Sequence, residues 1–419
     1  MRMENYEEVL NSIHFCGCED ILVGDVLHYS LTEKKSFWRG LKDIMCMIVK
    51  VSLKDNYKVE ISGEGKNLTL FSNSYKNRKD HLEAFRGVTS IINNRTLIEC
   101  SGEKINFGGL KYLFIVLKWN RKLIEKHFLF GDRMCLLRDL LQAYKDYCFI
   151  ERIIKKNKLK ICNVLVYCDV MPVDCFITQK FKKKGCKVVT FHHGAFAIEN
   201  NAWAYAKSKS DFFLADSKAS CDDAISVGYK GQIFAVGSPF QFNNVAISVR
   251  GPYKTGVFGL VMNSSADPVE DNKKMIETVQ EYCRQNGKVM FVKFHPADCA
   301  EKYRQLIDES IVKGQYFTDI TIDDFLKKID VVILSTSTVI KTALSMNKPT
   351  LIFVRKGFDH KKFRGTDELK FSSELELEAQ IKKIESGFED VMKRQNAYLN
   401  VLGSVADNYR DCYSSLEII

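Results

Sequence analysis

The stretch "DDFLKKIDVVILSTSTVIKTALSMNKPTLIFV", residues 323–354, decides the fold class of this chain of 419 residues. Two apolar runs rich in Val, Ile and Leu, at 330–337 and 349–354, flank a helical pattern at 338–347. Short apolar runs bounded by polar residues are typical of buried strands, and a helix between two of them is typical of a parallel crossover. The stretch therefore predicts an α/β fold with parallel strands.

The same alternation continues toward the N-terminus in two series. The first series begins near residue 161 and the second near residue 255, with an irregular stretch at 238–256 between them. The predicted strands are 163–169, 186–192, 211–217, 232–239, 255–263 and 288–296. Two series predict two Rossmann-like α/β domains that face each other across a cleft, an N-terminal domain at 1–240 and a C-terminal domain at 241–419.

The first 160 residues show a less regular pattern, and we assign them to the N-terminal domain. Strands are expected at 20–31 and 57–62, and helices within 74–94 and 109–158. In the C-terminal domain we expect further helices at 267–287, 301–311 and 321–329, the last with Thr321 as its N-cap. A closing helix or helix pair is expected from about Leu375.

The composition is that of a globular protein, with 46% hydrophobic and 27% charged residues. No apolar run approaches the ~20 residues of a membrane span, and the N-terminus lacks the apolar core of a signal peptide. The 14 cysteines are scattered and form no CxxC pair, so we expect reduced thiols in a cytoplasmic protein and no metal site.

The net charge of +10 lies in the first half of the chain. Residues 1–200 contain 33 basic and 23 acidic residues, whereas residues 201–419 contain 29 of each. A solvated basic face would explain this, but so would contact with an anionic partner such as a membrane surface or a polyanionic acceptor. The asymmetry favours the second interpretation.

One predicted strand ends in "KFHP", residues 293–296. Ligands of open parallel sheets bind at the carboxyl ends of the strands, so His295 is a candidate to contact or protonate a leaving phosphate. Pro296 stops the strand, and Lys293 shares the strand face of His295 and could add positive charge.

A run of four hydroxyl residues follows the strand at 330–337. Ser335, Thr336, Ser337 and Thr338 lie where a helix begins, and free N–H groups at a helix N-terminus bind phosphate. A single helix cap would need only one hydroxyl. The run therefore favours a phosphate site.

A third strand end, "FHHGAF" at 191–196, carries two adjacent histidines. Successive strand residues point to opposite sides, so one of the pair is expected to reach a substrate. We choose His193 over His192, because the neighbouring Gly194 leaves room for an acceptor.

These motifs together resemble a known group of enzymes. "KFHP", followed about 30 residues later by the stretch 323–354, resembles the nucleotide-binding half of GT-B transferases with an HP motif. The group includes CDP-glycerol glycerophosphotransferases, bacterial sialyl- and polysialyltransferases, and capsule transferases. "VVTFHHGAF" is similar to the strand ending in His-Gly in their N-terminal halves, so the resemblance covers residues 160–355.

The resemblance implies a metal-independent transferase with no separate cofactor. A sugar or polyol phosphate would pass from a CMP- or CDP-linked donor, bound by the C-terminal domain, to a surface-polysaccharide or lipid-linked acceptor bound by the N-terminal domain. His295, Ser337 and Thr338 would contact the donor phosphate, and His193 would be the base for the acceptor hydroxyl. A cytoplasmic protein, peripheral at the inner face of the membrane, is expected.

The sequence also departs from this group. The glycerophosphotransferases carry Asp-Tyr-Ser-Ser where this chain has Ser335 to Thr338, and the acidic residue that often holds the donor ribose is replaced by Thr342, beside Lys341. Thr342 is therefore a candidate donor contact, and the donor cannot be transferred from the group.

Two other functions remain open. UDP-sugar 2-epimerases share the two-domain fold and need carboxylates in the cleft, for which Asp169, Asp216 and Asp267 are candidates. A non-catalytic binding module is the other alternative, although histidines at facing strand ends argue against it. No motif of interleaved aromatic and basic residues indicates nucleic acid binding.

Overall fold

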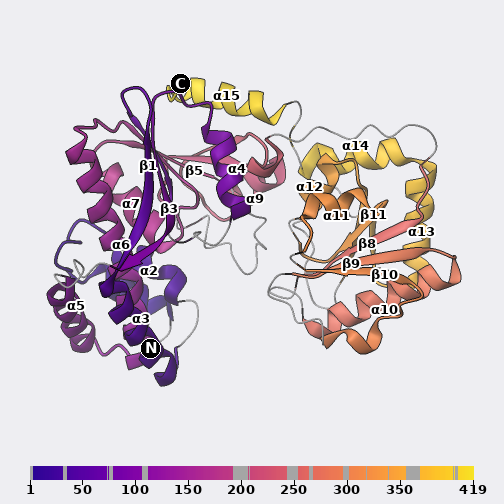
Figure 1. Cartoon of the computed structure of the whole chain (residues 1–419), viewed down its shortest axis with the longest axis horizontal. Coiled ribbons are helices and arrows are strands. Elements are labelled where there is room, and N and C mark those ends of the chain that lie inside the picture. Colours follow the sequence, from indigo (N-terminus) through magenta and orange to yellow (C-terminus); the bar gives the residue numbers. More distant parts are fainter. Residues whose placement is uncertain are drawn as a thin grey trace.

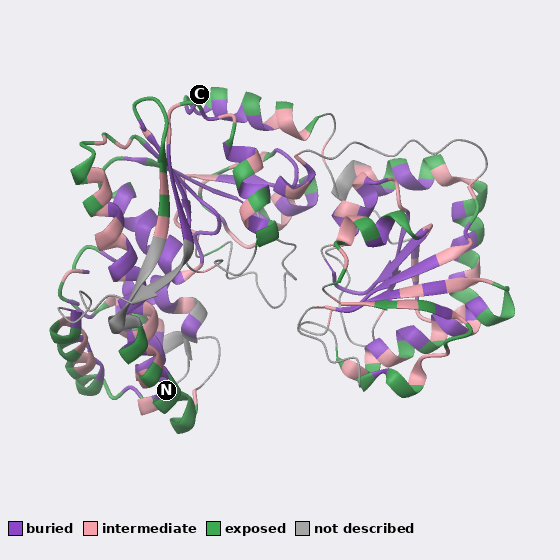
Figure 2. Ribbon diagram, viewed as in Figure 1, coloured by how far each residue is buried: buried purple, intermediate pink, exposed green. Residues whose placement is uncertain are grey.

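The fold is seen in a computed structural model of the chain (Figure 1). It describes residues 3–31, 35–72, 74, 79–105, 112–191, 206, 208–242, 253–263, 268–295, 302–317, 319–337, 339–354, 369–399, 401 and 404–419. Two sheets lie in two separate units, and buried strands form the centre of each unit (Figure 2). These two α/β units confirm the predicted fold class.

The C-terminal unit contains a six-stranded sheet in which all paired strands are parallel. Its strands are β8 (Val257–Val261), β9 (Val289–Lys293), β10 (Val312–Tyr316), β11 (Val331–Leu334), β12 (Thr350–Phe353) and β13 (Lys370–Phe371). They follow the order β10-β9-β8-β11-β12-β13. The chain thus starts in the middle, builds outward to one edge and then to the other, as in dinucleotide-binding sheets.

Helices cover this second sheet (Figure 1). The helices are α10 (Val269–Gln285), α11 (Ile322–Lys327), α12 (Val339–Ser345), α13 (Glu374–Ser386) and α14 (Phe388–Leu399). Thr321 caps α11 as predicted, because its side chain accepts a hydrogen bond from the Asp324 N–H.

The N-terminal unit contains a seven-stranded sheet in the order β1-β3-β2-β4-β5-β6-β7. Its strands are β1 (Leu53–Ile61), β2 (Asn67–Phe71), β3 (Arg95–Ile105), β4 (Asn163–Val166), β5 (Lys187–Phe191), β6 (Phe212–Ala215) and β7 (Gln232–Ala235). Only the edge strand β1 runs antiparallel to its neighbour among these described pairings. Its main helices are α4 (Lys79–Thr89), α5 (Leu113–Glu125), α6 (Phe130–Lys156), α7 (Pro172–Lys182) and α9 (Lys218–Ser226).

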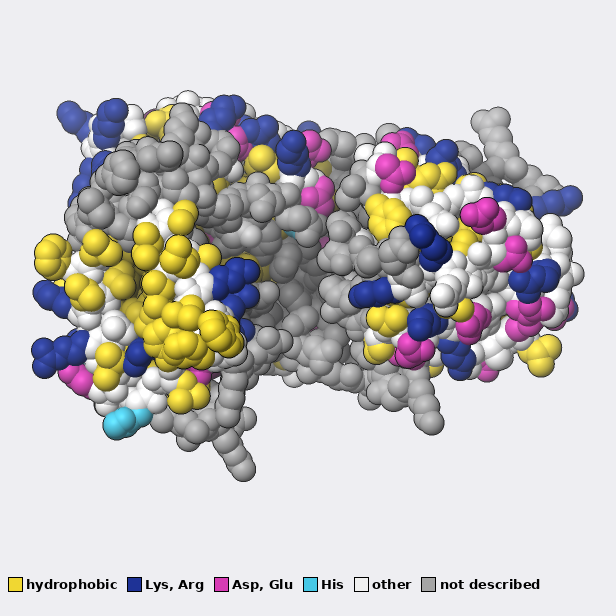
Figure 3. All heavy atoms as spheres, turned by 60° about the horizontal axis from the view of Figure 1, so that its bottom comes forward, with side chains coloured by type: hydrophobic (Ala, Val, Ile, Leu, Met, Phe, Trp, Pro, Cys, Tyr) yellow, Lys and Arg dark blue, Asp and Glu magenta, His cyan; other side chains and the backbone are white. Residues whose placement is uncertain are grey.

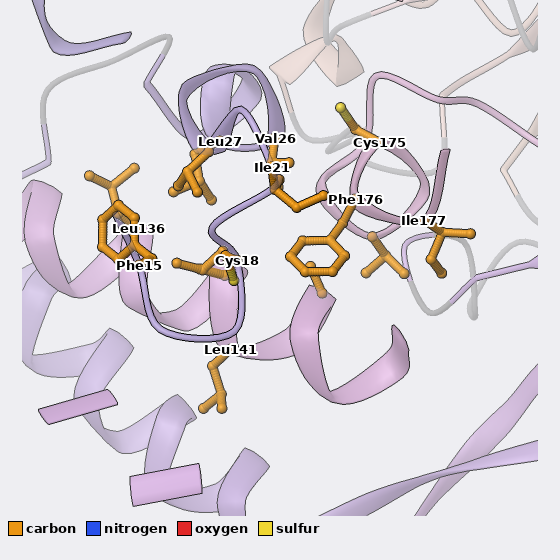
Figure 4. Packing of buried hydrophobic residues seen from close by; sticks show 14 of the residues in the cluster. Phe15, Cys18, Ile21, Val26, Leu27, Leu136, Leu141, Cys175, Phe176 and Ile177 are labelled. Atoms are coloured by element: carbon orange, nitrogen blue, oxygen red, sulfur yellow. The ribbon is translucent and has the colours of Figure 1, made fainter. Parts of the chain in front are cut away.

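The segment before the first sheet is helical where we predicted a strand at 20–31. Residues Val23–Leu27 form α2, and His28–Leu31 form a 3₁₀ turn, η1. The strand prediction was wrong because Val23, Val26 and Leu27 follow a helical spacing. All three are buried in one core with residues of α6 and α7, part of which Figure 4 shows.

Two more helices precede the first strand, α1 (Met3–Asn11) and α3 (Phe37–Ser52).

A second prediction also fails, since the helix expected at 301–311 is only a short 3₁₀ turn, η6 (Arg304–Leu306). The edge strand β10 follows this turn. Its residues alternate between more and less buried positions, so its five residues contain no continuous apolar run that would have predicted a strand.

The last helix, α15 (Val405–Ser415), packs on the first sheet and not on the second (Figure 1). Tyr409 and Tyr413 are fully buried in one core with Phe191 and Leu214, and the Tyr409 hydroxyl donates to the Gly237 carbonyl at 3.2 Å. The chain therefore crosses between the units twice. Among the helices in the described ranges, none is long and apolar enough to cross a bilayer.

Candidate functional site at the strand ends

The second sheet reverses its building direction between β8 and β11, and polar residues from both strands meet there. Asn263 lies two residues after β8, and Ser335 follows β11 directly. The Asn263 amide donates to the Thr336 hydroxyl at 3.1 Å. Ligands of open α/β sheets bind outside the carboxyl ends of the two strands at such a reversal. Asn263 was not singled out from the sequence, although a polar residue at a strand end could have marked it.

The hydroxyl run after β11 is buried in this structure. Ser335, Thr336 and Ser337 have exposed fractions of 1%, 4% and 8%. The Ser337 hydroxyl accepts a hydrogen bond at 3.3 Å from the N–H of Val339, the first residue of α12. The Ser335 hydroxyl is buried and has no hydrogen-bond partner among the described residues. Thr338 lies outside the described residues.

His295 lies at the same edge of the sheet, two residues after β9 and partly exposed. β8 separates β9 from β11, which places two strand spacings, about 10 Å, between the ends of β9 and β11. His295 and the hydroxyl run therefore flank the end of β8 from its two sides. A ligand that contacts both must span that distance.

Lys293 is turned toward the far edge of the sheet. Its ammonium group donates to the backbone carbonyl of Phe317, just past β10, and only 8% of the residue is exposed. Burial lowers the pKa of Lys293, and the nearby carboxylate of Asp319 opposes this effect. The charge of Lys293 thus lies on the β10 side of β9 in this structure, and β11 lies on the opposite side.

A buried ion pair joins the two units at their strand ends. Lys341, in α12, pairs with Asp216, which follows β6 of the first sheet directly. The exposed fractions are 6% for Lys341 and 3% for Asp216. The Ser220 hydroxyl donates to Asp216 at 2.6 Å, and the Lys341 ammonium donates to Ser220 at 3.2 Å and to Ser217 at 3.4 Å. Hydroxyl groups therefore satisfy both buried charges, as such a pair requires.

The same region of α12 makes a second contact with the first unit. The Gln241 amide, in the 3₁₀ turn η4 (Pro239–Gln241), donates to the Lys341 carbonyl at 2.9 Å. Ala219 of α9 is buried in one core with residues of α11 and α12. Thr342, the candidate donor contact beside Lys341, is partly exposed. The contacts place α12 between the ends of β11 and β6.

Asp169, just past β4, holds a segment of the chain in place. One oxygen of its carboxylate accepts hydrogen bonds from the Ser208 hydroxyl, the Lys209 N–H, the Ser210 N–H and the Ser210 hydroxyl, all at 2.7–2.8 Å. Asp169 is 2% exposed. These four hydrogen bonds give Asp169 a structural role in holding residues 208–210.

The first sheet also reverses its building direction, between β2 and β4. There the Ser72 hydroxyl, just past β2, donates to Asp174 at 3.0 Å in the first turn of α7. Asp174 is fully buried, which raises its pKa well above the ordinary value of 3.8. The raised pKa favours a protonated, uncharged Asp174 near the carboxyl ends of β2 and β4.

The histidines of the first unit are only partly described. His192 and His193 lie outside the described residues, as does Asp267, so their predicted roles stay predictions. His81, which the sequence did not single out, lies in the first turns of α4 and is 5% exposed. Its ring makes edge contacts with Tyr167 and Phe240, at 5.4 and 5.1 Å between ring centroids. The position of His81 in the helix after β2 could have marked it as a candidate in the sequence.

No cluster of His, Cys, Asp and Glu that could hold a metal occurs among the residues that the structure describes. Cys18 lies in the sequence Cys-Gly-Cys at 16–18 and is buried, and burial raises the pKa of its thiol to about 12.

Comparisons with known proteins find similarity in solved structures only. No protein-family model matches the chain, and no curated protein matches its sequence. The UDP co-structure of S. aureus MnaA is 13% identical and covers 66% of this chain and 80% of its own, with a TM-score of 0.44. UDP-GlcNAc 2-epimerase from Neisseria meningitidis, bound to UDP-GlcNAc, is 11% identical and covers 67% and 82%, with a TM-score of 0.44. A mutant of S. aureus TarM in complex with Fondaparinux, alpha-GlcNAc-glycerol and UDP is 12% identical and covers 66% and 57%, with a TM-score of 0.41. At these identities the function has to be inferred from the residues of this chain.

Proposed function

We propose that this protein is a transferase that uses a nucleotide-activated donor, bound outside the ends of β8 and β11. One observation carries the proposal: the strand order reverses between β8 and β11, and Asn263 and Thr336 from the two strand ends meet at that point. Nucleotides bind at this place in open parallel sheets. The hydroxyl run that begins at Ser335 supplies donors for a phosphate there.

The donor phosphates would bind between the hydroxyl run and His295. Ser337 and Thr338 would contact one phosphate, and His295 would stabilise the leaving phosphate or protonate it. The two strand ends lie about 10 Å apart. A diphosphate that accepts a hydrogen bond at each end, or a phosphate with its attached sugar, can bridge that distance. His193 would act as the base that deprotonates the acceptor hydroxyl.

The transferred group would be a sugar or a polyol phosphate, and the acceptor a surface polysaccharide or a lipid-linked precursor. The support for this is the sequence of motifs from "KFHP" to "NKP", which resembles transferases of capsule and teichoic acid synthesis. The same resemblance suggests a CMP- or CDP-linked donor and no metal ion.

An isomerase of the UDP-sugar 2-epimerase type is the second candidate, because carboxylates end strands of the first sheet. Each described carboxylate there is engaged, however. Asp169 holds residues 208–210, Asp174 is fully buried, and Asp216 pairs with Lys341. These contacts favour a transferase over an isomerase that relies on free carboxylates.

Nucleotide binding tests the proposed donor site. We expect CMP or CDP to raise the melting temperature of the wild-type protein, because a ligand that binds only the folded state stabilises it. Replacing Ser337 and Thr338 with Val should weaken nucleotide binding by about 1–3 kcal/mol, the cost of lost hydrogen bonds to a charged group. Thr278→Val, in α10, removes a hydroxyl that donates only to the Lys274 carbonyl at 2.8 Å and is the matched control. Unchanged nucleotide affinity in a folded double variant would exclude this site.

Product analysis separates the candidate functions. A transferase releases nucleotide from its donor when an acceptor is added, whereas an epimerase interconverts two sugar nucleotides without an acceptor. Stabilisation by UDP alone, together with epimerised sugar, would favour the isomerase. Nucleotide binding without turnover of any donor would indicate a binding module.

A further inference from the structure

An apolar surface lies on α3, in the N-terminal unit and apart from the strand ends. Its side chains are Phe37, Trp38, Leu41, Met45, Ile48 and Val49, with exposed fractions from 38% to 78%. At 3.6 residues per turn these positions fall within an arc of about 120° on one face of the helix. The opposite face is buried against α6, where Asp43 of α3 pairs with Arg138. The exposed apolar face of α3 therefore does not contribute to the packing of this helix on α6.

Helix α5 adds a second apolar face of the same kind. Leu113, Phe114, Leu117 and Ile124 are 41–75% exposed, while Trp119 and Leu123 on the other side of the helix are buried. Both α3 and α5 pack on α6, and Figure 3 shows hydrophobic side chains gathered over this part of the molecule. We call the exposed apolar residues of α3 and α5 the apolar patch. Together with Leu129 they are eleven of the sixteen large hydrophobic side chains that are exposed in the described ranges.

Basic side chains border the apolar patch. Arg39 and Lys42 of α3 and Lys118 and Arg121 of α5 are exposed, and dark blue side chains adjoin the patch in Figure 3. Asp43 pairs with Arg138 and Arg39, and Glu125 pairs with Arg121, so two of these four basic side chains share their charge with a carboxylate. A helix with Trp, Phe and Leu on one side and Lys and Arg beside them is typical of a helix that lies in the surface of a membrane.

We infer that the apolar patch docks on a bilayer that contains anionic lipids. Its aromatic and aliphatic side chains would enter the boundary between headgroups and acyl chains, and the bordering basic residues would contact anionic headgroups. A second copy of the chain fits this surface less well. A twofold axis through the patch would bring the basic border of one copy against that of the other. The docking does not depend on the proposed transferase function.

Vesicle sedimentation tests the docking. The full chain should bind vesicles of phosphatidylcholine with phosphatidylglycerol more tightly than vesicles of phosphatidylcholine alone, and salt should weaken binding to the anionic vesicles. Trp38→Ser with Phe114→Ser should lower the partition coefficient by roughly 10- to 100-fold, because two large apolar side chains are lost. Ile225→Ser with Leu375→Ser is the matched control, since these exposed residues lie on α9 and α13, outside the patch, and it should bind like wild type.

The fluorescence of Trp38 gives a second measurement. Of the three tryptophans, Trp38 is 78% exposed, Trp119 is buried and Trp203 lies outside the described residues, so comparison with Trp38→Phe isolates the signal of Trp38. Vesicles should shift the emission of wild-type protein to shorter wavelength, and Trp38→Phe should remove much of that shift while it retains binding. Wild-type binding by the Trp38→Ser and Phe114→Ser variant would overturn the inference. So would a wild-type dimer that ignores vesicles and becomes monomeric in this variant, because the patch would then join two copies. Nucleotide-induced stabilisation should be unchanged in the variant, so failure of the docking is distinct from failure of the proposed function.

Discussion

The buried pair between Lys341 and Asp216 provides the sharpest test of how the two units are joined. Replacing Lys341 with Met keeps an unbranched apolar side chain in α12 but leaves the Asp216 carboxylate buried without its cation. Loss of one partner of a buried pair costs about 3–5 kcal/mol. Ser217 and Ser220 still donate to Asp216, at 3.0 and 2.6 Å, so we expect the lower end of that range.

The double variant Lys341→Met with Asp216→Asn removes both charges and keeps an acceptor for Ser220. It should be more stable than Lys341→Met alone, with a coupling energy of at least about 2 kcal/mol. Chemical denaturation measures these free energies of unfolding. If the two units unfold separately, the denaturation curve is fitted with one transition for each unit. The exposed pair between Arg410 and Asp407 is the control, and it should show little coupling because solvent screens it. If the costs of the two single variants at Lys341 and Asp216 simply add, the pair does not form in solution and α12 is not held to β6 in this way.

Three further predictions concern single residues. Asp174 has a raised pKa, so the folded state keeps its proton at pH values where the unfolded state has lost it, and stability falls as the pH rises from about 4 toward the folded pKa. Asp174→Asn does not titrate, so the stability of this variant relative to wild type should increase with pH in denaturation experiments, and a constant difference from pH 5 to 8 would contradict the protonated carboxyl. Asp169→Ala leaves the donors at 208–210 without their acceptor and should increase the proteolysis of that segment. Intact protection would mean that the segment is held elsewhere. His295→Ala should slow both transfer and hydrolysis of the donor, whereas His193→Ala should slow transfer alone by about 10²–10⁴. Wild-type transfer by His193→Ala would place the base elsewhere, and His192→Ala then tests the neighbouring position.

The sequence alone determined the α/β class and the positions of most strands of the second unit. A parallel strand that is buried on both faces needs apolar residues at successive positions, as in the runs 330–337 and 349–354. Such a run can be recognised from neighbouring residues alone. The same local reasoning found Thr321 as a cap and marked the strand ends at His295 and Ser335. It failed at 20–31, where helical spacing and β-branched residues gave conflicting signals.

Only the tertiary structure decided which strand ends meet. The order of the second sheet places β8 between β9 and β11, so Asn263 contacts Thr336 while His295 lies on the other side of β8. Lys341 and Asp216 are 125 positions apart in the sequence, and nothing in the local pattern of either residue indicates its partner. Local spacing determines helices and strands because it acts over a few residues. The pairing of distant side chains depends on sheet order and on how the two units pack, which the whole chain determines.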